Sequence, residues 1–250
     1  MAGAGAGSSL STGVRRLAAA YDAPVTTPIE PAEGGPAAGP ATPPSIDKTR
    51  TEAFSDGVFA IAITLLVLEV RVPGAAQVRE YGGLLPALLH GWVSYLSYLI
   101  TFLTVGVIWL NHHAGFARIA RVDRTVQWWN LLLLLVVSFT PFPNALLTEY
   151  LTADLFGEPA RTAAAVYALV FTLSTLPWLF IWGHLAGAPH LLAPGTDVAF
   201  ARRRRRRAVL GATVYGACVL VAVVAPVLAL VLFVGAALFY AVTAGAQQAE

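Results

Sequence analysis

The residues that could do chemistry gather around one short apolar segment near residue 60. Val58 to Leu68 is an apolar run of eleven residues, interrupted only by Thr64, with Asp56 just before it and Glu69 just after it. A carboxylate on a lipid-facing helix is costly, so such residues normally face protein or water and mark ion or proton pathways. This helix is therefore expected to be surrounded by protein or water, and not by lipid alone.

The remaining reactive residue types are not arranged for metal binding or catalysis. His112 and His113 are adjacent, so on a helix they diverge by about 100° and cannot share a metal as an i, i+4 pair would. The other three histidines show no pairing pattern, and Cys218 is the only cysteine, so no intrachain disulfide or thiolate cluster can form. We expect no metal, no cofactor and no enzymatic activity.

Helical geometry divides the segment around residue 60 into two faces. At 100° per residue, one stripe lies within about 60° of Ile61. Its members are Phe54, Ile61, Thr64, Leu65 and Leu68. Ser55 and Asp56 fall about 120° and 140° away from Ile61. The polar pair is expected to face neighbouring helices, and the stripe faces the opposite side, toward either lipid or a pore axis.

The composition identifies the setting of this helix as a membrane. Hydrophobic residues make up 57% of the 250 residues, charged residues only 12%, and the mean hydropathy is +0.67. Soluble domains carry about 25% charged residues. The apolar runs predict an all-α fold of six transmembrane helices, the third kinked by its prolines and the last two forming a hairpin. The predicted ranges are 48–72, 84–112, 126–149, 161–183, 208–224 and 227–242.

The distribution of basic residues predicts the orientation. With six helices, thirteen of the sixteen basic residues fall on the N-terminal side of the membrane, including the run Arg202–Arg207. The positive-inside rule then places both termini in the cytoplasm of a multi-pass cell-membrane protein. The arginine run is expected to anchor the topology against anionic lipid, not to bind nucleic acid.

Residues 1–46 are rich in Gly, Ala, Pro and Ser. They are expected to form a disordered cytoplasmic tail, because they cannot bury enough apolar surface to offset the cost of ordering. Residues 47–245 form the predicted transmembrane domain, and 246–250 a short cytoplasmic C-terminal tail.

Three motifs resemble the bacterial relatives of transmembrane protein 175. The first is the RxxxFSDG signature and the apolar helix after it, with signature residues Arg50, Phe54, Ser55, Asp56 and Gly57. The second, Trp109-Leu-Asn111-His112-His113, and the third, Asn130 to Pro143, are similar to later segments of that family. The resemblance covers about residues 48–245.

The resemblance implies a potassium channel without a TVGYG filter, built from four six-helix subunits whose first helices line the pore. Carried over by position, Ile61, Leu65 and Leu68 would form the apolar constriction and Thr64 a hydroxyl layer next to it. The signature residues would brace the pore helix. For Asp56, the expected partners are Arg50, Asn111, His112 or His113, while Asp47 is the better candidate for the N-terminal cap.

Two other functions compete with the channel. A proton-coupled secondary transporter would use Asp56 or a histidine, and it predicts inverted repeats and broken helices at mid-membrane. The run Val58–Leu68 contains no Gly or Pro, which disfavours it. A membrane-embedded enzyme would need a nucleophile–base pair or a metal cluster. Subunit stoichiometry discriminates the channel from the transporter, because a single first helix cannot enclose a path.

Overall fold

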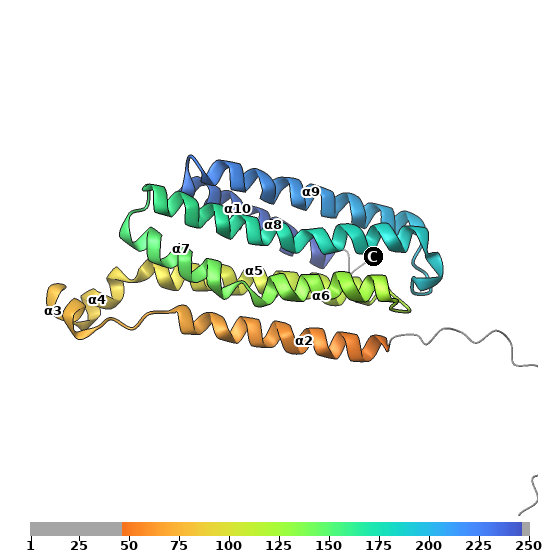
Figure 1. Cartoon of the computed structure of the whole chain (residues 1–250), viewed down its shortest axis with the longest axis horizontal. Coiled ribbons are helices and arrows are strands. Elements are labelled where there is room, and N and C mark those ends of the chain that lie inside the picture. Colours follow the sequence, from red (N-terminus) through yellow and green to blue (C-terminus); the bar gives the residue numbers. More distant parts are fainter. Residues whose placement is uncertain (1–46, 247–250) are drawn as a thin grey trace, which may run out of the picture. The chain divides into compact units, whose positions relative to one another are not determined.

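A computed structural model describes residues 47–246, and every regular element within them is a helix (Figure 1). In chain order the elements are α2 (Lys48–Leu65), η1 (Leu66–Glu69), α3 (Ala75–Glu80), α4 (Leu84–His90), α5 (Trp92–Phe116), α6 (Arg124–Ser138), α7 (Pro141–Ala153), α8 (Glu158–Gly187), η2 (Pro189–Leu191), α9 (Val198–Ala222) and α10 (Pro226–Ala246). The predicted N-terminal tail lies outside the described residues, as does the C-terminal tail except for Ala246, which ends α10.

Four stretches of the described chain are long and apolar enough to cross a membrane. They are Lys48–Glu69, Trp92–Phe116, Arg124–Ala153 and Glu158–Gly187. The apolar stretch Pro226–Phe239 in α10 is shorter, and α9 carries the arginine run in its first half. The predicted all-helical membrane fold is therefore confirmed, with a helix at each of the six predicted places and four candidate spans.

The start of α2 is set by Asp47, as predicted. Its carboxylate accepts hydrogen bonds from the backbone N–H groups of Thr49 and Arg50, at 2.9 and 3.4 Å. The first turn has N–H groups without helical partners, so this cap stabilises it. The far end differs from the prediction. The helix tightens into η1 and the chain is extended from Val70, short of the predicted residue 72.

Two other boundaries also depart from the predicted ranges. The predicted second helix divides at Gly91 into α4 and α5. The helix expected at 208–224 begins ten residues earlier, because the Asp197 carboxylate accepts from the Phe200 N–H at 2.7 Å and caps the new start. Arginine is a good helix former, so the run Arg202–Arg207 extends the helix where a loop was expected.

The predicted kink in the third helix is confirmed as a break. α6 ends at Ser138, and α7 begins at Pro141 after only Phe139 and Thr140. Proline has no N–H to donate and fixes its own φ, so it suits the first position of a new helix.

The helices pack in a bundle in which α2 lies along one edge (Figure 1). α2 contacts α5 and α6, while α8 packs against α6, α7, α9 and α10. The core between them includes Phe59 of α2, together with Tyr167, Phe171 and Phe233, whose rings lie about 5 Å from one another. α2 is thus held from one side only within the described chain.

A second apolar cluster fixes the loops at the end of the bundle where α2 begins. Phe116, Ile119, Trp182 and Leu192 are buried there. Backbone bonds join the two loops, from the Ala193 N–H to the Arg118 carbonyl at 3.0 Å among others. These contacts hold Arg118 beside the start of α9.

Candidate functional site: the uncovered face of α2 and its anchors

α2 has one buried face and one uncovered face. The buried side chains recur at helical spacing: Thr51, Ser55, Phe59, Ala62 and, in η1, Leu66. On the other side, Ile61 is 61%, Leu65 42% and Leu68 74% exposed. Thr64 and Phe54 are exposed on the same side. The structure therefore separates the two faces as helical geometry predicted, while the pore role of the exposed stripe stays a prediction.

The hydroxyl of Thr64 has a hydrogen-bond acceptor within its own helix, while the side chain stays on the exposed face of α2. Its hydroxyl donates to the Ile61 carbonyl at 2.9 Å. Because the proton is used within the helix, the oxygen lone pairs remain available on the exposed side.

Ser55 is fully buried, as expected for a residue facing neighbouring helices, and it begins a polar chain across three helices. The Ser55 hydroxyl donates to the Thr51 carbonyl at 2.8 Å and accepts from the Asn130 amide of α6 at 2.9 Å. The amide oxygen of Asn130 lies 2.8 Å from Nε2 of His112 in α5. Since that oxygen can only accept, Nε2 of His112 carries the proton. Ser55 and Asn130 thereby fix the position of α2 on the bundle.

The His112 ring is enclosed by aromatic side chains. It stacks on Phe116 with ring centroids 4.3 Å apart and meets Trp178 edge-on at 5.8 Å and Phe59 at 5.4 Å. A buried imidazole needs a hydrogen-bond partner, and Asn130 supplies it. The structure thus gives His112 a place in the packing around α2.

The hydrogen-bond partner of Asp56 in the structure is Trp109, and not one of the residues expected from the sequence, which were Arg50, Asn111, His112 and His113. Asp56 is exposed, and its carboxylate accepts from the Trp109 indole N–H of α5 at 2.8 Å. The Asn111 amide donates instead to the Val107 carbonyl of its own helix. His113 makes only a ring contact with Trp109, at 6.1 Å.

The remaining signature residues make few contacts within the subunit. Arg50, Phe54 and Gly57 are exposed, and a Cβ added at Gly57 would meet nothing within 4 Å. Sequence reasoning missed Trp109 and Asn130 as the residues that hold the signature. An indole N–H within a membrane helix needs an acceptor, but the sequence does not show which acceptor lies within reach of Trp109.

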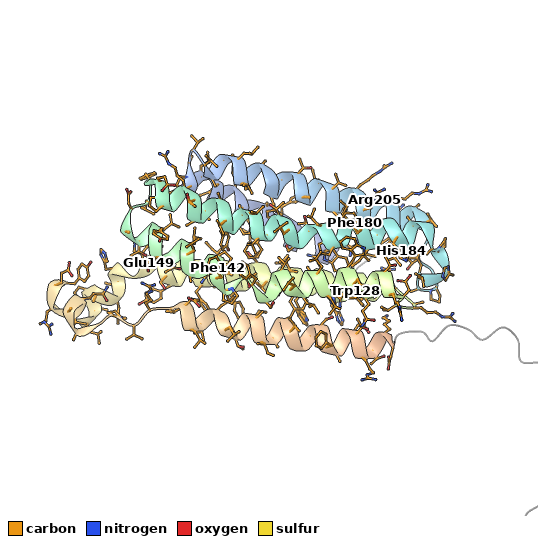
Figure 2. All side chains as sticks on the ribbon, viewed as in Figure 1. Trp128, Phe142, Glu149, Phe180, His184 and Arg205 are labelled. Carbon is orange, nitrogen blue, oxygen red and sulfur yellow. The ribbon has the colours of Figure 1, made fainter. Side chains whose placement is uncertain are left out.

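Charged pairs mark the two ends of the bundle (Figure 2). Near the α3–α4 end, Arg71 forms an ion pair with Glu149 of α7. At the other end, Nε2 of His184 in α8 lies 2.6 Å from the carboxylate of Asp123, which also caps α6 by accepting from the Val126 N–H at 2.9 Å. Burial acts to raise the pKa of Asp123, but the hydrogen bonds from Val126 and His184 outweigh it and hold that pKa below its ordinary value.

Among residues 47–246, no group of three or more His, Cys, Asp or Glu side chains is placed to hold a metal ion. What the arrangement offers is an uncovered apolar stripe with one hydroxyl, on a helix anchored by polar contacts from behind.

Comparison with known proteins identifies relatives of this chain. Residues 50–141 match the family described as endosomal/lysosomal potassium channel TMEM175. A potassium channel of Streptomyces collinus is 47% identical over 166 residues, which cover 66% of this chain and 78% of that protein. A potassium channel of Chamaesiphon minutus is 48% identical over 155 residues, 62% of this chain and 74% of that protein.

A solved structure extends the similarity to the fold. The crystal structure of a lysosomal potassium-selective channel TMEM175 homologue from Chamaesiphon minutus superposes with a TM-score of 0.69 at 38% identity. The match covers 79% of this chain and 97% of that chain.

Proposed function

We infer that this chain, which belongs to the TMEM175 family, forms a potassium-permeable ion channel whose constriction is made by the exposed stripe of α2. Four copies, the number that the family resemblance implies, would place one α2 each around a central axis. Ile61, Leu65 and Leu68 would then form apolar rings, and Thr64 a ring of hydroxyls between them.

The observation that carries this proposal is the uncovered face of α2. The described subunit packs α2 from one side only, and the exposed stripe lies opposite the anchors Ser55 and Phe59. A purely lipid-facing stripe would need no hydroxyl such as that of Thr64. A water-filled axis shared with other copies accommodates this hydroxyl.

The membrane topology of the proposal follows from the charge distribution. The second half of α9 and the apolar part of α10 would add a fifth and a sixth crossing to the four candidate spans. Arg205 and Glu149 lie toward opposite ends of the bundle in Figure 2. By the positive-inside rule, the arginine end of the bundle would face the cytoplasm. Both termini would then lie on the cytoplasmic side of the cell membrane.

The mechanism needs no covalent chemistry. An apolar neck admits water and ions reluctantly, so it gates by dewetting, and it requires a cation to lose part of its hydration shell. Potassium loses its water more readily than sodium does, so an uncharged neck favours potassium. Hydroxyls at Thr64 would replace some of the lost water.

The direct test is ion flux. Full-length protein in proteoliposomes should pass potassium down its gradient faster than sodium, and empty liposomes should pass neither. Well-folded protein that passes no cation would refute the channel, and a monomer as the active species would favour a transporter.

The accessibility of single cysteines to Cd²⁺ tests separately which face of α2 lines the pore. In a Cys218→Ser background, Ile61→Cys should allow Cd²⁺ to block the current, because thiols from several copies would meet at the axis. The matched control is Ile63→Cys, since Ile63 packs against the buried core. Block of the control and not of Ile61→Cys would mean that another face lines the pore.

A further inference from the structure

A pocket of about 140 Å³ lies within the subunit, far from the uncovered face of α2. It is lined by residues of α5, α8, α9 and α10. Ile108, Phe171 and Ala237 form an apolar wall, and Arg204 and Arg207 of the arginine run line its other end. A pocket that combines an apolar wall with guanidinium groups is suited to an amphiphile with an anionic head.

Four of the uncharged polar side chains that line this pocket are already hydrogen-bonded within their own helices. The hydroxyls of Thr104, Ser174 and Thr175 and the amide of Asn111 each donate to a backbone carbonyl three or four residues earlier. By contrast, the buried Nε of Arg204 has no hydrogen-bond partner within the described chain. Within the described chain, the buried donor of this lining that is left for a ligand is therefore cationic.

Positive charge also accumulates here without compensation. The guanidinium groups of Arg118 and Arg204 lie 5.3 and 5.7 Å from the centroid of the Phe200 ring, and Arg204 also lies 5.6 Å from the Trp182 ring. None of Arg118, Arg204 and Arg207 forms an ion pair with a carboxylate of residues 47–246. Aromatic faces hold the guanidinium planes, while their N–H edges stay free for an anion.

We propose that this pocket binds the phosphate-bearing headgroup of an anionic phospholipid. Arg204 and Arg207 pair with the phosphate, and one acyl chain lies along the apolar wall between α5, α8 and α10. The position at the arginine end of the bundle fits a headgroup at the membrane surface, where anionic lipid attracts basic side chains. A free phosphate shares the recognition by arginine, but it would leave the apolar wall unfilled.

The test titrates the purified full-length protein with phosphatidylglycerol, phosphatidylcholine or inorganic phosphate and counts bound lipid by native mass spectrometry. Phosphatidylglycerol should bind tightly and phosphatidylcholine weakly. Arg204→Gln should weaken phosphatidylglycerol binding about tenfold, as expected for loss of a charge-assisted hydrogen bond. Arg206→Gln, an exposed member of the same run that does not line the pocket, should weaken it less than about twofold, as a surface charge does.

Exposed Arg207 provides a second variant that does not disturb a buried contact, and Arg207→Gln should also weaken binding. Equal losses in the Arg206 and Arg204 variants would overturn the pocket in favour of general attraction to the arginine run. Competition by inorganic phosphate at the same concentration as the lipid would overturn the lipid assignment. Neither result bears on ion flux, so the channel proposal is judged independently.

Discussion

At the residue scale, Ile61 and Ile63 offer a matched pair of positions on one helix. Ile61 is 61% exposed, whereas Ile63 packs against the buried core. Ile61→Asn would place amides that bind water and either cation on the proposed axis, so the neck should wet. We expect a larger current and weaker discrimination of potassium from sodium, measured as the reversal potential under bi-ionic conditions.

Ile63→Asn should instead weaken packing, because it buries an amide among apolar neighbours. This variant should have a lower melting temperature than the unaltered protein but the same reversal potential. If the Ile63 variant loses selectivity while the Ile61 variant keeps it, the pore face has been assigned to the wrong side of α2.

The contact between Asp56 and Trp109 permits a second residue-scale prediction. Trp109→Phe removes the indole donor and keeps an aromatic ring, and Asp56→Ala removes the acceptor. Each single change should lower stability by roughly 0.5–2 kcal/mol, and the double variant should lose less than the sum, because the pair shares one hydrogen bond.

Unfolding of the protein in detergent measures these losses. Trp92→Phe is the control, since Trp92 is exposed and lies on the same helix. Additive losses in the double variant would show that the hydrogen bond between Asp56 and Trp109 does not stabilise the docking of α2.

At the scale of elements, helical periodicity was sufficient to predict the two faces of α2, since burial follows the 3.6-residue repeat from Thr51 to Leu66. It was not sufficient to predict what holds the helix. Asn130 lies 75 residues from Ser55, and Trp109 lies 53 residues from Asp56. Periodicity within one helix carries no information on the rotation of its neighbours, so these partners required the packed structure.

Some of the predicted helix boundaries were wrong for a related reason. Hydropathy marks where a helix is apolar, so it placed the start of the fifth helix after the arginine run. The actual start at Val198 is set by the Asp197 cap and by the helix propensity of arginine, which hydropathy does not measure. The break before Pro141 was predictable because proline acts locally on the backbone.

The pair that joins the start of α6 to α8 should make stability depend on acidity. The pKa of Asp123 is held below its ordinary value, so the pair stabilises the fold above about pH 4 and that contribution is lost as the pH falls through the lowered pKa. The melting temperature should therefore fall between pH 5 and pH 3 more steeply in the unaltered protein than in Asp123→Asn. The asparagine retains the helix cap, so the difference isolates the charge. Equal slopes would mean that Asp123 is not favoured as a carboxylate in the fold.

At the scale of the whole molecule, two groups of residues around α2 have different partners. The chain of Ser55, Asn130 and His112 is internal and positions α2. The exposed signature residues Arg50 and Phe54 find no cover within the described chain and lie on surfaces that other copies would reach in the proposed assembly. Arg50 and Phe54 would thus be covered only when the subunits associate, which links pore formation to oligomerisation.

The orientation of that assembly can be tested with two near-neutral substitutions. Val72 is 87% exposed just beyond η1, and Thr125 is exposed at the start of α6, toward the opposite end of the bundle. In a Cys218→Ser background, a membrane-impermeant thiol reagent should label Val72→Cys in intact cells. The same reagent should label Thr125→Cys only after the membrane is permeabilised, because the basic residues near Thr125 favour the cytoplasm.

Thr125→Cys is close to isosteric and leaves the Asp123 cap in place, so loss of labelling cannot be attributed to misfolding of α6. Labelling of Thr125→Cys from outside, with Val72→Cys protected, would invert the topology and place the arginine run and its lipid pocket on the external face.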